Sequence, residues 1–228
     1  MQNNKEEYMP RFDTIIFDLD GTLTDSAPGI INSIKYASAK LGYRELTAPE
    51  LRSCVGPPLA EHIMGILGLS QEESLEFLKA YREYFAQKGI YENNVYHNVP
   101  AMLAELREMG VRLMLCTGKP EPYAREVLRY FELLDYFEDV LGPTFEGKYN
   151  DKAEGLAELL RRSHAVNCVM AGDRKYDIIA AKANGVASVG VLWGYGSREE
   201  LKASGADYIL DSPKQLVELI RDSQTAVF

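Results

Sequence analysis

Cysteine is scarce in this sequence and is not arranged for disulfide formation or metal binding. The 228 residues include three cysteines, Cys54, Cys116 and Cys168. Their odd number and wide separation disfavour a disulfide framework and a zinc knuckle. A reducing, cytoplasmic compartment is therefore the default expectation.

Long hydrophobic runs are lacking too. No stretch approaches the roughly 18 consecutive apolar residues by which a transmembrane helix is recognised, so we expect no membrane partner. The opening residues MQNNKEEYMPRFD contain no apolar segment of the kind found in secretory signals. We accordingly expect no export signal.

Positive charge is in deficit. Lys and Arg number 25 against 34 Asp and Glu, which gives a net charge of −9. This balance argues against a nucleic acid polymer as a partner, because such binding needs clustered cations. An anionic substrate would require a local cation or metal that reverses the field at its site.

What the chain does contain is an alternation of short strands and helices. Residues 12–17 form a β-branched and aromatic run typical of a buried strand. After residue 100, strands expected at 111–116, 139–141, 166–171, 187–192 and 208–210 alternate with helices at 102–109, 121–130, 151–162, 177–184, 198 onward and 213–222. This order predicts an α/β fold with a doubly wound, Rossmann-like parallel sheet and right-handed crossovers.

One block interrupts the alternation. Residues 27–93 are expected to be almost entirely helical, with capping boxes at Thr47–Glu50 and Ser70–Glu73. The simplest interpretation is an all-helical cap domain inserted after the first strand. We expect residues 1–26 and 98–228 to form the core and residues 27–97 to form the cap.

Polar residues follow the predicted strands, and in such sheets ligands bind beyond the carboxyl ends of the strands. Four of them are carboxylates, which repel one another when gathered and should share a hard cation such as Mg²⁺. A hydroxyl and an ammonium accompany them. The set comprises Asp18, Asp20, Thr117, Lys152, Asp173 and Asp177.

These residues fall into motifs that resemble those of a known family. Asp18-Leu-Asp-Gly-Thr-Leu-Thr-Asp25 resembles the first motif of the haloacid dehalogenase superfamily, the aspartate-nucleophile phosphohydrolases. Thr117, Lys152 and the segment 172–177 resemble its second, third and fourth motifs, in family order. The helical cap and the tail at 190–196 are similar to the phosphoglycolate-phosphatase-like branch. A single Asp-x-Asp is weak evidence, whereas four ordered motifs are strong evidence.

The resemblance implies a Mg²⁺-dependent hydrolase of phosphate monoesters. Asp18 would attack phosphorus to give an aspartyl phosphate, and Asp20 would serve as general acid and then general base. Thr117, the amide of Gly118 and Lys152 would hold the phosphoryl oxygens. Asp18, the carbonyl of Asp20, Asp173 and Asp177 would ligate the metal, Asp177 directly or through water.

Some residues have two interpretations. Lys148 could compete with Lys152 for the phosphate, but a capping box at 151–154 should fix the direction of Lys152, so we favour Lys152. Lys119 could touch the substrate or merely begin a loop. Asp25 could orient the catalytic loop or cap the first cap helix, and we favour a supporting role behind the site.

One further motif has a structural interpretation. Cys168 and Arg174 match the C-x5-R spacing of cysteine phosphatases. That chemistry needs the cysteine in a loop of free amides, whereas Cys168 lies inside the strand predicted at 166–171, so we expect a buried thiol. We assign no catalytic role to His62, His97 or His164.

Competing functions differ at a few positions. A receiver-like phospho-acceptor domain has no second aspartate two residues after the acceptor, and a dehalogenase has no acid at the position of Asp20. A phosphosugar mutase remains an alternative, as do a 5′-nucleotidase and a pyrophosphatase of the same branch.

The cap should act as a lid that selects the substrate. We expect its substrate contacts in the loop Val55–Leu59, which includes Gly56, while Arg52 could bind an anion or be solvated. A sheltered site favours a small phosphorylated metabolite. A monomer and a homodimer are both compatible with the sequence.

Overall fold

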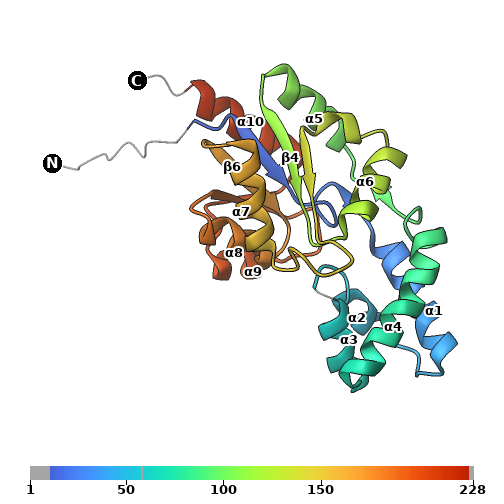
Figure 1. The fold of residues 1–228 in the computed structure, drawn as a ribbon. Coiled ribbons are helices and arrows are strands. Elements are labelled where there is room, and N and C mark those ends of the chain that lie inside the picture. Colours follow the sequence, from blue (N-terminus) through green and yellow to red (C-terminus); the bar gives the residue numbers. More distant parts are fainter. Residues whose placement is uncertain (1–10, 58, 226–228) are drawn as a thin grey trace.

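The computed structural model describes residues 11–57 and 59–225. Two sequence-based predictions fall partly outside these residues: the one on an export signal, which concerns the first residues, and Pro58 of the predicted specificity loop. Figure 1 shows a sheet covered by helices, with a block of further helices on one side of it.

The sheet has six parallel strands in the order β5-β4-β1-β6-β7-β8. The strands are β1 (Thr14–Phe17), β4 (Arg112–Cys116), β5 (Asp139–Leu141), β6 (Cys168–Gly172), β7 (Ala187–Val191) and β8 (Tyr208–Leu210). β1 lies at the centre, with Ile16 opposite Met114 of β4 and Met170 of β6. The predicted doubly wound parallel sheet is confirmed.

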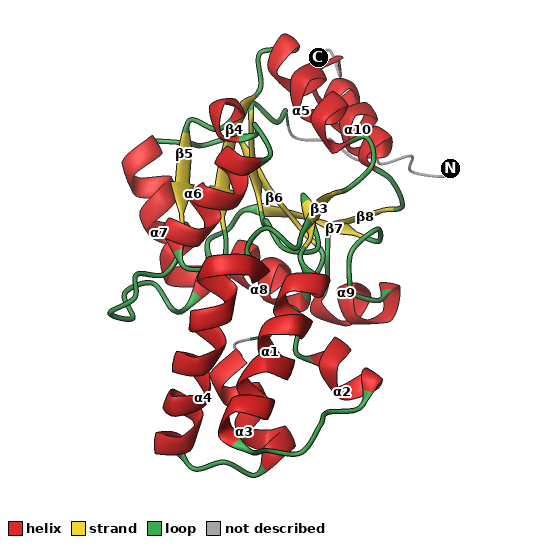
Figure 2. Cartoon of the chain, turned by 90° about the vertical axis from the view of Figure 1, so that its right-hand side faces the viewer, coloured by secondary structure: helices red, strands yellow, loops and turns green. Residues whose placement is uncertain are grey.

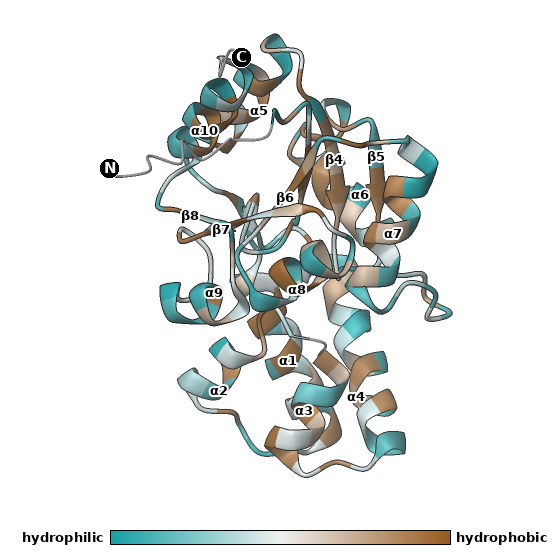
Figure 3. Cartoon of the chain, turned by 90° about the vertical axis from the view of Figure 1, so that its left-hand side faces the viewer, coloured by the Kyte–Doolittle hydropathy of each residue, from teal (hydrophilic) through white to brown (hydrophobic). Residues whose placement is uncertain are grey.

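Helices cover both faces of this sheet. They are α5 (Val99–Glu108), α6 (Glu121–Tyr130), α7 (Lys152–Ser163), α8 (Lys175–Ala183), α9 (Arg198–Ser204) and α10 (Pro213–Thr225), with a 3-10 turn η2 (Leu134–Tyr136). Neighbouring side chains of β1 point to opposite faces. Ile15 and Phe17 join the apolar cluster under α5, α6 and α10, whereas Ile16 joins the cluster under α7 and α8. Figure 3 shows the hydrophobic strands between the more polar helices.

Between β1 and β4 the chain forms the helical block. It consists of α1 (Ala27–Leu41), α2 (Ala48–Ser53), α3 (Leu59–Leu67), α4 (Gln71–Tyr84) and a π-helix, η1 (Phe85–Gly89). Both predicted capping boxes are present, at Thr47 and Ser70, and Gly42 ends α1 in the left-handed conformation. Figure 2 shows the block below the sheet, next to α8 and α9.

Two short strands connect the core and the helical block. β2 (Thr24–Asp25) pairs antiparallel with β3 (Asn94–Val95). The sequence analysis did not predict this pair. The pair lies just beyond the end of β1. It holds side by side the two crossings, that is, the segment in which the chain leaves the core for the helical block and the segment in which it returns.

The boundaries of a few elements differ from the predicted ones. β6 begins at Cys168 rather than Val166, which is 83% exposed. α8 begins at Lys175 rather than Asp177. At the start of α7 the Asp151 side chain accepts from the backbone N of Ala153, one residue before the position that a capping box uses.

None of the helices in the described part of the chain has the length and apolar character needed to cross a bilayer.

Candidate active site

A tight turn after β1 presents the first two aspartates. Asp18 follows the last residue of β1, and its backbone N donates to the carbonyl of Ala171 in β6 (2.9 Å). Gly21 closes the turn with a φ of 84°. A Cβ on Gly21 would lie 2.3 Å from Oδ2 of Asp173, so this position needs glycine both for its backbone and for its contact.

Asp173 enters the same site from the end of β6 and is completely buried. Its Oδ2 accepts from the backbone N of Tyr195 (2.8 Å), and its Oδ1 faces the Thr22 hydroxyl at 3.4 Å. A Cβ on Gly194 would lie 2.1 Å from the carbonyl of Gly21. The loop after β7 therefore packs its glycine backbone directly on the turn after β1.

Lys152, in the first turn of α7, joins two of the carboxylates. Its Nζ lies 3.0 Å from Oδ2 of Asp18 and 2.6 Å from Oδ1 of Asp177. The second oxygen of Asp177 accepts from the backbone N of Arg174 (3.0 Å), so both carboxylate oxygens of Asp177 have partners within the protein. Carboxylate oxygens of Asp18, Asp173 and Asp177 lie within 4.8 Å of one another.

Asp20 forms a separate pair at the edge of this cluster. Its Oδ2 lies 2.8 Å from Nζ of Lys119, whose side chain is only 5% exposed. Thr117 is buried and its hydroxyl accepts from the backbone N of Lys119 (3.2 Å), whereas Gly118 is exposed. The position of Lys119 beside Asp20 agrees with the interpretation that Lys119 belongs to the site, and not with the one in which it merely begins a loop.

The electrostatics of the cluster reflect burial and crowding. Burial, together with the neighbouring carboxylates Asp177 and Asp18, raises the pKa of Asp173 to about 8. Burial also raises the pKa of Asp18 to about 6, although Lys152 opposes this shift. Burial disfavours the charged form of Lys152, but the negative charges of Asp177 and Asp18 favour it more strongly. The pKa of Lys152 is therefore raised. One ammonium cannot balance three gathered carboxylates.

The donor set fits a hard divalent cation. Oδ1 of Asp18 and Oδ1 of Asp20 are buried and have no hydrogen-bond partner among the residues that the structure describes. Unpartnered buried oxygens are costly unless a ligand satisfies them. Oxygen ligands of this kind suit Mg²⁺, which keeps several waters and takes one or two carboxylates.

Three of the remaining candidate residues lie elsewhere. Lys148 is exposed and its Nζ lies over the ring of Tyr149. Asp25 accepts hydrogen bonds from the Tyr195 hydroxyl (2.8 Å) and the backbone N of Ala27 (3.2 Å), so it holds the start of the crossing into α1. Cys168 is buried in β6, as expected.

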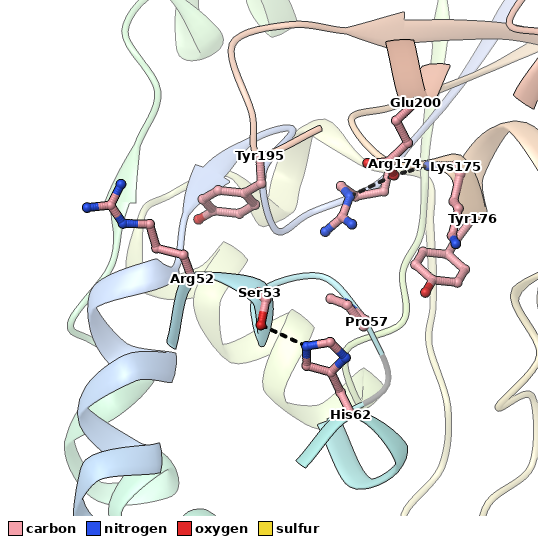
Figure 4. A pocket seen from close by; sticks show the side chains of 9 residues that line it. All are labelled: Arg52, Ser53, Pro57, His62, Arg174, Lys175, Tyr176, Tyr195 and Glu200. Atoms are coloured by element: carbon pink, nitrogen blue, oxygen red, sulfur yellow. Dashed lines mark hydrogen bonds and ion pairs between the residues drawn. The ribbon is translucent and has the colours of Figure 1, made fainter. Parts of the chain in front are cut away.

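A cavity of about 580 Å³ is lined by residues of both the helical block and the core, and Figure 4 shows these side chains. Arg52 and His62 line it from the block, and Nε2 of His62 lies 2.9 Å from the Ser53 hydroxyl. Arg174 crosses from the core and donates to the carbonyl of Val55 (2.9 Å).

Gly56 of the predicted specificity loop lies against the same Arg174 side chain. Gly56 has a φ of 104°, and a Cβ there would lie 2.5 Å from Nη1 of Arg174. The loop therefore contacts the core beside Asp173 through Arg174. A direct contact of Gly56 with substrate stays a prediction.

Sequence reasoning missed two residues at the site. Tyr195 contributes both its backbone N to Asp173 and its hydroxyl to Asp25, and its Gly-flanked position was the available signal. Phe85 lies with its ring 4.9 Å from Nζ of Lys119. No local signal in the sequence distinguishes a ring that only packs from a ring that faces an ammonium.

Comparison with known proteins gives a consistent result. A model of the haloacid dehalogenase-like hydrolase family matches residues 15–191. The chain is 39% identical over 195 residues to a 5′-nucleotidase of Pseudomonas aeruginosa, covering 85% of this chain and 88% of the relative. It is 32% identical over 216 residues to the phosphoglycolate phosphatase of Vibrio parahaemolyticus, covering 90% and 95%.

Two further matches are informative. The tyrosine-protein kinase PtkA of Mycobacterium tuberculosis is 39% identical over 185 residues, which cover 80% of this chain and 62% of the relative. Among solved structures, a predicted phosphatase from Clostridium acetobutylicum superposes with a TM-score of 0.88 at 36% identity, covering 93% of this chain and 99% of that chain.

Proposed function

The chain belongs to the haloacid dehalogenase-like hydrolase family, and from this premise we propose that it is a Mg²⁺-dependent phosphatase of small phosphorylated metabolites. The observation that carries the proposal is the setting of Asp18. Its Oδ2 is held by Lys152 at 3.0 Å, while its Oδ1 is buried and has no hydrogen-bond partner within the described ranges 11–57 and 59–225. A carboxylate with one fixed and one free oxygen is suited to nucleophilic attack.

The metal would be held by Asp18 and Asp173, with the backbone carbonyl of Asp20. Asp177 would act directly or through water, beside the contacts that its two oxygens make with Lys152 and with the backbone N of Arg174. When bound, Mg²⁺ supplies charge that offsets the repulsion between an anionic nucleophile and an anionic phosphate.

The covalent steps use two carboxylates of the chain. Asp18 forms a bond to phosphorus as the bond from phosphorus to the leaving oxygen breaks, and Asp20 gives that oxygen a proton. Asp20 then takes a proton from a water molecule, whose oxygen attacks phosphorus and releases Asp18 with inorganic phosphate. Atoms and charge balance with water as the only co-reactant.

Three groups would hold the phosphoryl oxygens between these steps. Lys152 supplies the positive charge, and the Thr117 hydroxyl and the amide of Gly118 supply hydrogen bonds.

Residues 27–97 would serve as the lid over a core formed by residues 1–26 and 98–228. The pairing of β2 with β3 gives the two crossings a common position, as a hinge requires. Closure of the lid would exclude bulk water from the acyl phosphate.

Two substrate classes have support among the relatives, phosphoglycolate and nucleoside 5′-monophosphates. We place small phosphate monoesters first and nucleotides second. The cavity at Arg52 and His62 could accept a leaving group larger than glycolate. The remaining alternatives are hydrolysis of pyrophosphate and isomerisation of a phosphosugar.

The test is phosphate release from a panel of monoesters and pyrophosphate. It is run with Mg²⁺, with a chelator, and with Asp18→Asn. We expect release that needs both Mg²⁺ and Asp18. Release that persists in Asp18→Asn, or phosphoryl transfer to protein tyrosine in place of water, would contradict the proposal.

A further inference from the structure

A buried ammonium stands next to the residue assigned as general acid. Lys119 is 8% exposed as a residue, and its Nζ lies 2.8 Å from Oδ2 of Asp20. Lysine is almost never buried unless it is paired. The pair therefore fixes both partners, and it fixes Asp20 through one oxygen only.

The other oxygen of Asp20 is left free. Oδ1 is buried and has no hydrogen-bond partner in the described part of the chain. A carboxylate held by Oδ2 can rotate little, so Oδ1 keeps a defined direction. Proton transfer depends on such a direction, because the acid must lie within hydrogen-bond reach of the leaving oxygen.

The helical block supplies the surface against which Lys119 rests. The ring of Phe85 lies 4.9 Å from Nζ of Lys119 and is 3% exposed. An aromatic face attracts an ammonium, and more strongly where water is excluded. Phe85 opens the π-helix η1, and π-helical turns occur frequently at functional sites.

Other rings fix the position of Phe85 itself. Tyr81, one turn earlier in α4, stacks on it with centroids 5.4 Å apart. Tyr123 of α6 in the core meets it edge to face at 5.3 Å. Phe85 is thus held between the helical block and the core, directly over Lys119.

We infer that Phe85 is a positioning residue for Asp20: its ring holds the Lys119 ammonium, which in turn holds Oδ2 of Asp20 and directs Oδ1 at the substrate. This inference rests on the proposed phosphatase function. It connects the position of the helical block on the core to the proton transfers in the core, because the ring belongs to the block and the acid to the core. Phe85 itself touches no reacting atom.

The first experiment compares two matched ring deletions. Phe85→Leu removes the ring over Lys119, and Phe77→Leu removes an equally buried ring from the same helical block, where Phe77 packs against Tyr43. Melting temperatures verify folding. We expect Phe85→Leu to lower kcat on an alkyl phosphate about tenfold, part of the roughly 10²–10⁴-fold contribution of a positioned acid. KM should stay nearly constant, and Phe77→Leu should lower stability without lowering kcat.

The second experiment is a double-mutant cycle with Lys119→Met. If Phe85 acts through Lys119, the double variant is as slow as Lys119→Met alone, since the effects of coupled residues are not additive. In an Asp20→Asn background, Phe85→Leu should cause no further loss.

The outcomes separate the two proposals. Equal kcat for Phe85→Leu and Phe77→Leu, or additive losses in the cycle, would overturn the inference while wild-type hydrolysis leaves the phosphatase function in place. A wild-type protein that releases no phosphate with Mg²⁺ would overturn both.

Discussion

At the scale of single residues, the charge balance of the site depends on Lys152. It is the one ammonium within hydrogen-bond distance of Asp18 and of Asp177 in the described residues. Its position follows from Asp151, which caps α7 and directs the first turn toward the carboxylates. Lys148, four residues earlier, is exposed and carries an ordinary surface charge.

Replacing each lysine by methionine should therefore have very different results. Lys152→Met leaves buried carboxylates without compensation, which should cost about 3 kcal/mol of the free energy of unfolding. Phosphate release should fall at least about a hundredfold. Lys148→Met should change the free energy of unfolding by less than about 0.5 kcal/mol. Denaturant titration of the metal-free proteins and a phosphate assay measure both effects; similar losses in the two variants would refute the assignment.

The three thiols make a second prediction at this scale. Burial raises the pKa of Cys54 and of Cys168 to about 11 and that of Cys116 to about 12. Because the thiolate is the reactive form, all three should react slowly with a thiol reagent at neutral pH in the native protein. All should react after unfolding in urea. Rapid native labelling of Cys168 would reopen the cysteine-phosphatase alternative.

Single residues also show what the sequence could and could not predict. Asp18, Thr117 and Asp173 were predictable because each follows a strand and the ends of parallel strands lie together, whereas Lys152 was predictable as the start of a helix between two of these strands. The pairing of Lys119 with Asp20 depends on side-chain rotamers. The ring of Phe85 reaches Lys119 only through the packing of the helical block on the core, which no local pattern encodes.

At the scale of elements, local chemistry predicted the helices well. The capping boxes at Thr47 and Ser70 involve only residues within one stretch of four, so they can be predicted from the local sequence. The strands β2 and β3 have two residues each and lie about 70 residues apart in the chain. Their pairing follows from tertiary packing, which explains why periodicity did not indicate it.

The loop from Val55 provides the prediction at this scale. Gly56→Ala would place a Cβ 2.5 Å from Nη1 of Arg174, so the guanidinium must move and its bond to Val55 weakens. We expect the ratio of kcat/KM values for two substrates with different leaving groups to change several-fold. This is about the effect that a small change in the shape of a pocket has on substrate discrimination. Turnover of a small activated phosphate should change less.

Gly68→Ala is the matched control for this loop. Gly68 also has a positive φ, 69°, but a Cβ there meets nothing within 4 Å. It should therefore introduce an alanine at a positive φ, with milder strain than at 104°, and without the shift in selectivity. An equal loss on every substrate in Gly56→Ala would show that the loop only supports the fold.

At the scale of the whole molecule, an acidic protein must bind an anion. The net charge of −9 opposes a phosphate, and the buried carboxylates add to the repulsion. Two features of the site offset this repulsion. They are the local ammonium groups of Lys119 and Lys152, and carboxylates that suit a divalent ion. The same carboxylates bind protons when no metal is present, so metal binding, pH and stability are linked.

The last prediction follows from this linkage. The folded-state pKa values of Asp173 and Asp18, about 8 and about 6, lie above the ordinary 3.8. At pH values between the ordinary pKa of 3.8 and these raised values, the folded protein binds more protons at Asp173 and Asp18 than the unfolded chain does. The contribution of these two groups to stability therefore falls as pH rises. Mg²⁺ needs the deprotonated carboxylates, and it should raise the melting temperature by several degrees near about pH 8.5 but much less near about pH 5.5.

Asp173→Asn tests the cause of this pH dependence. Removing the carboxyl with the most raised pKa should make the metal-free protein more stable than wild type near about pH 8.5, because a buried charge is lost. The same change should remove most of the stabilisation by Mg²⁺, because a ligand is lost. Differential scanning fluorimetry of both proteins, with Mg²⁺ and with chelator at each of the two pH values, gives the eight melting temperatures that these comparisons need. A Mg²⁺ shift that is the same at both pH values, or that survives in Asp173→Asn, would mean that the ion binds somewhere other than the buried carboxylates.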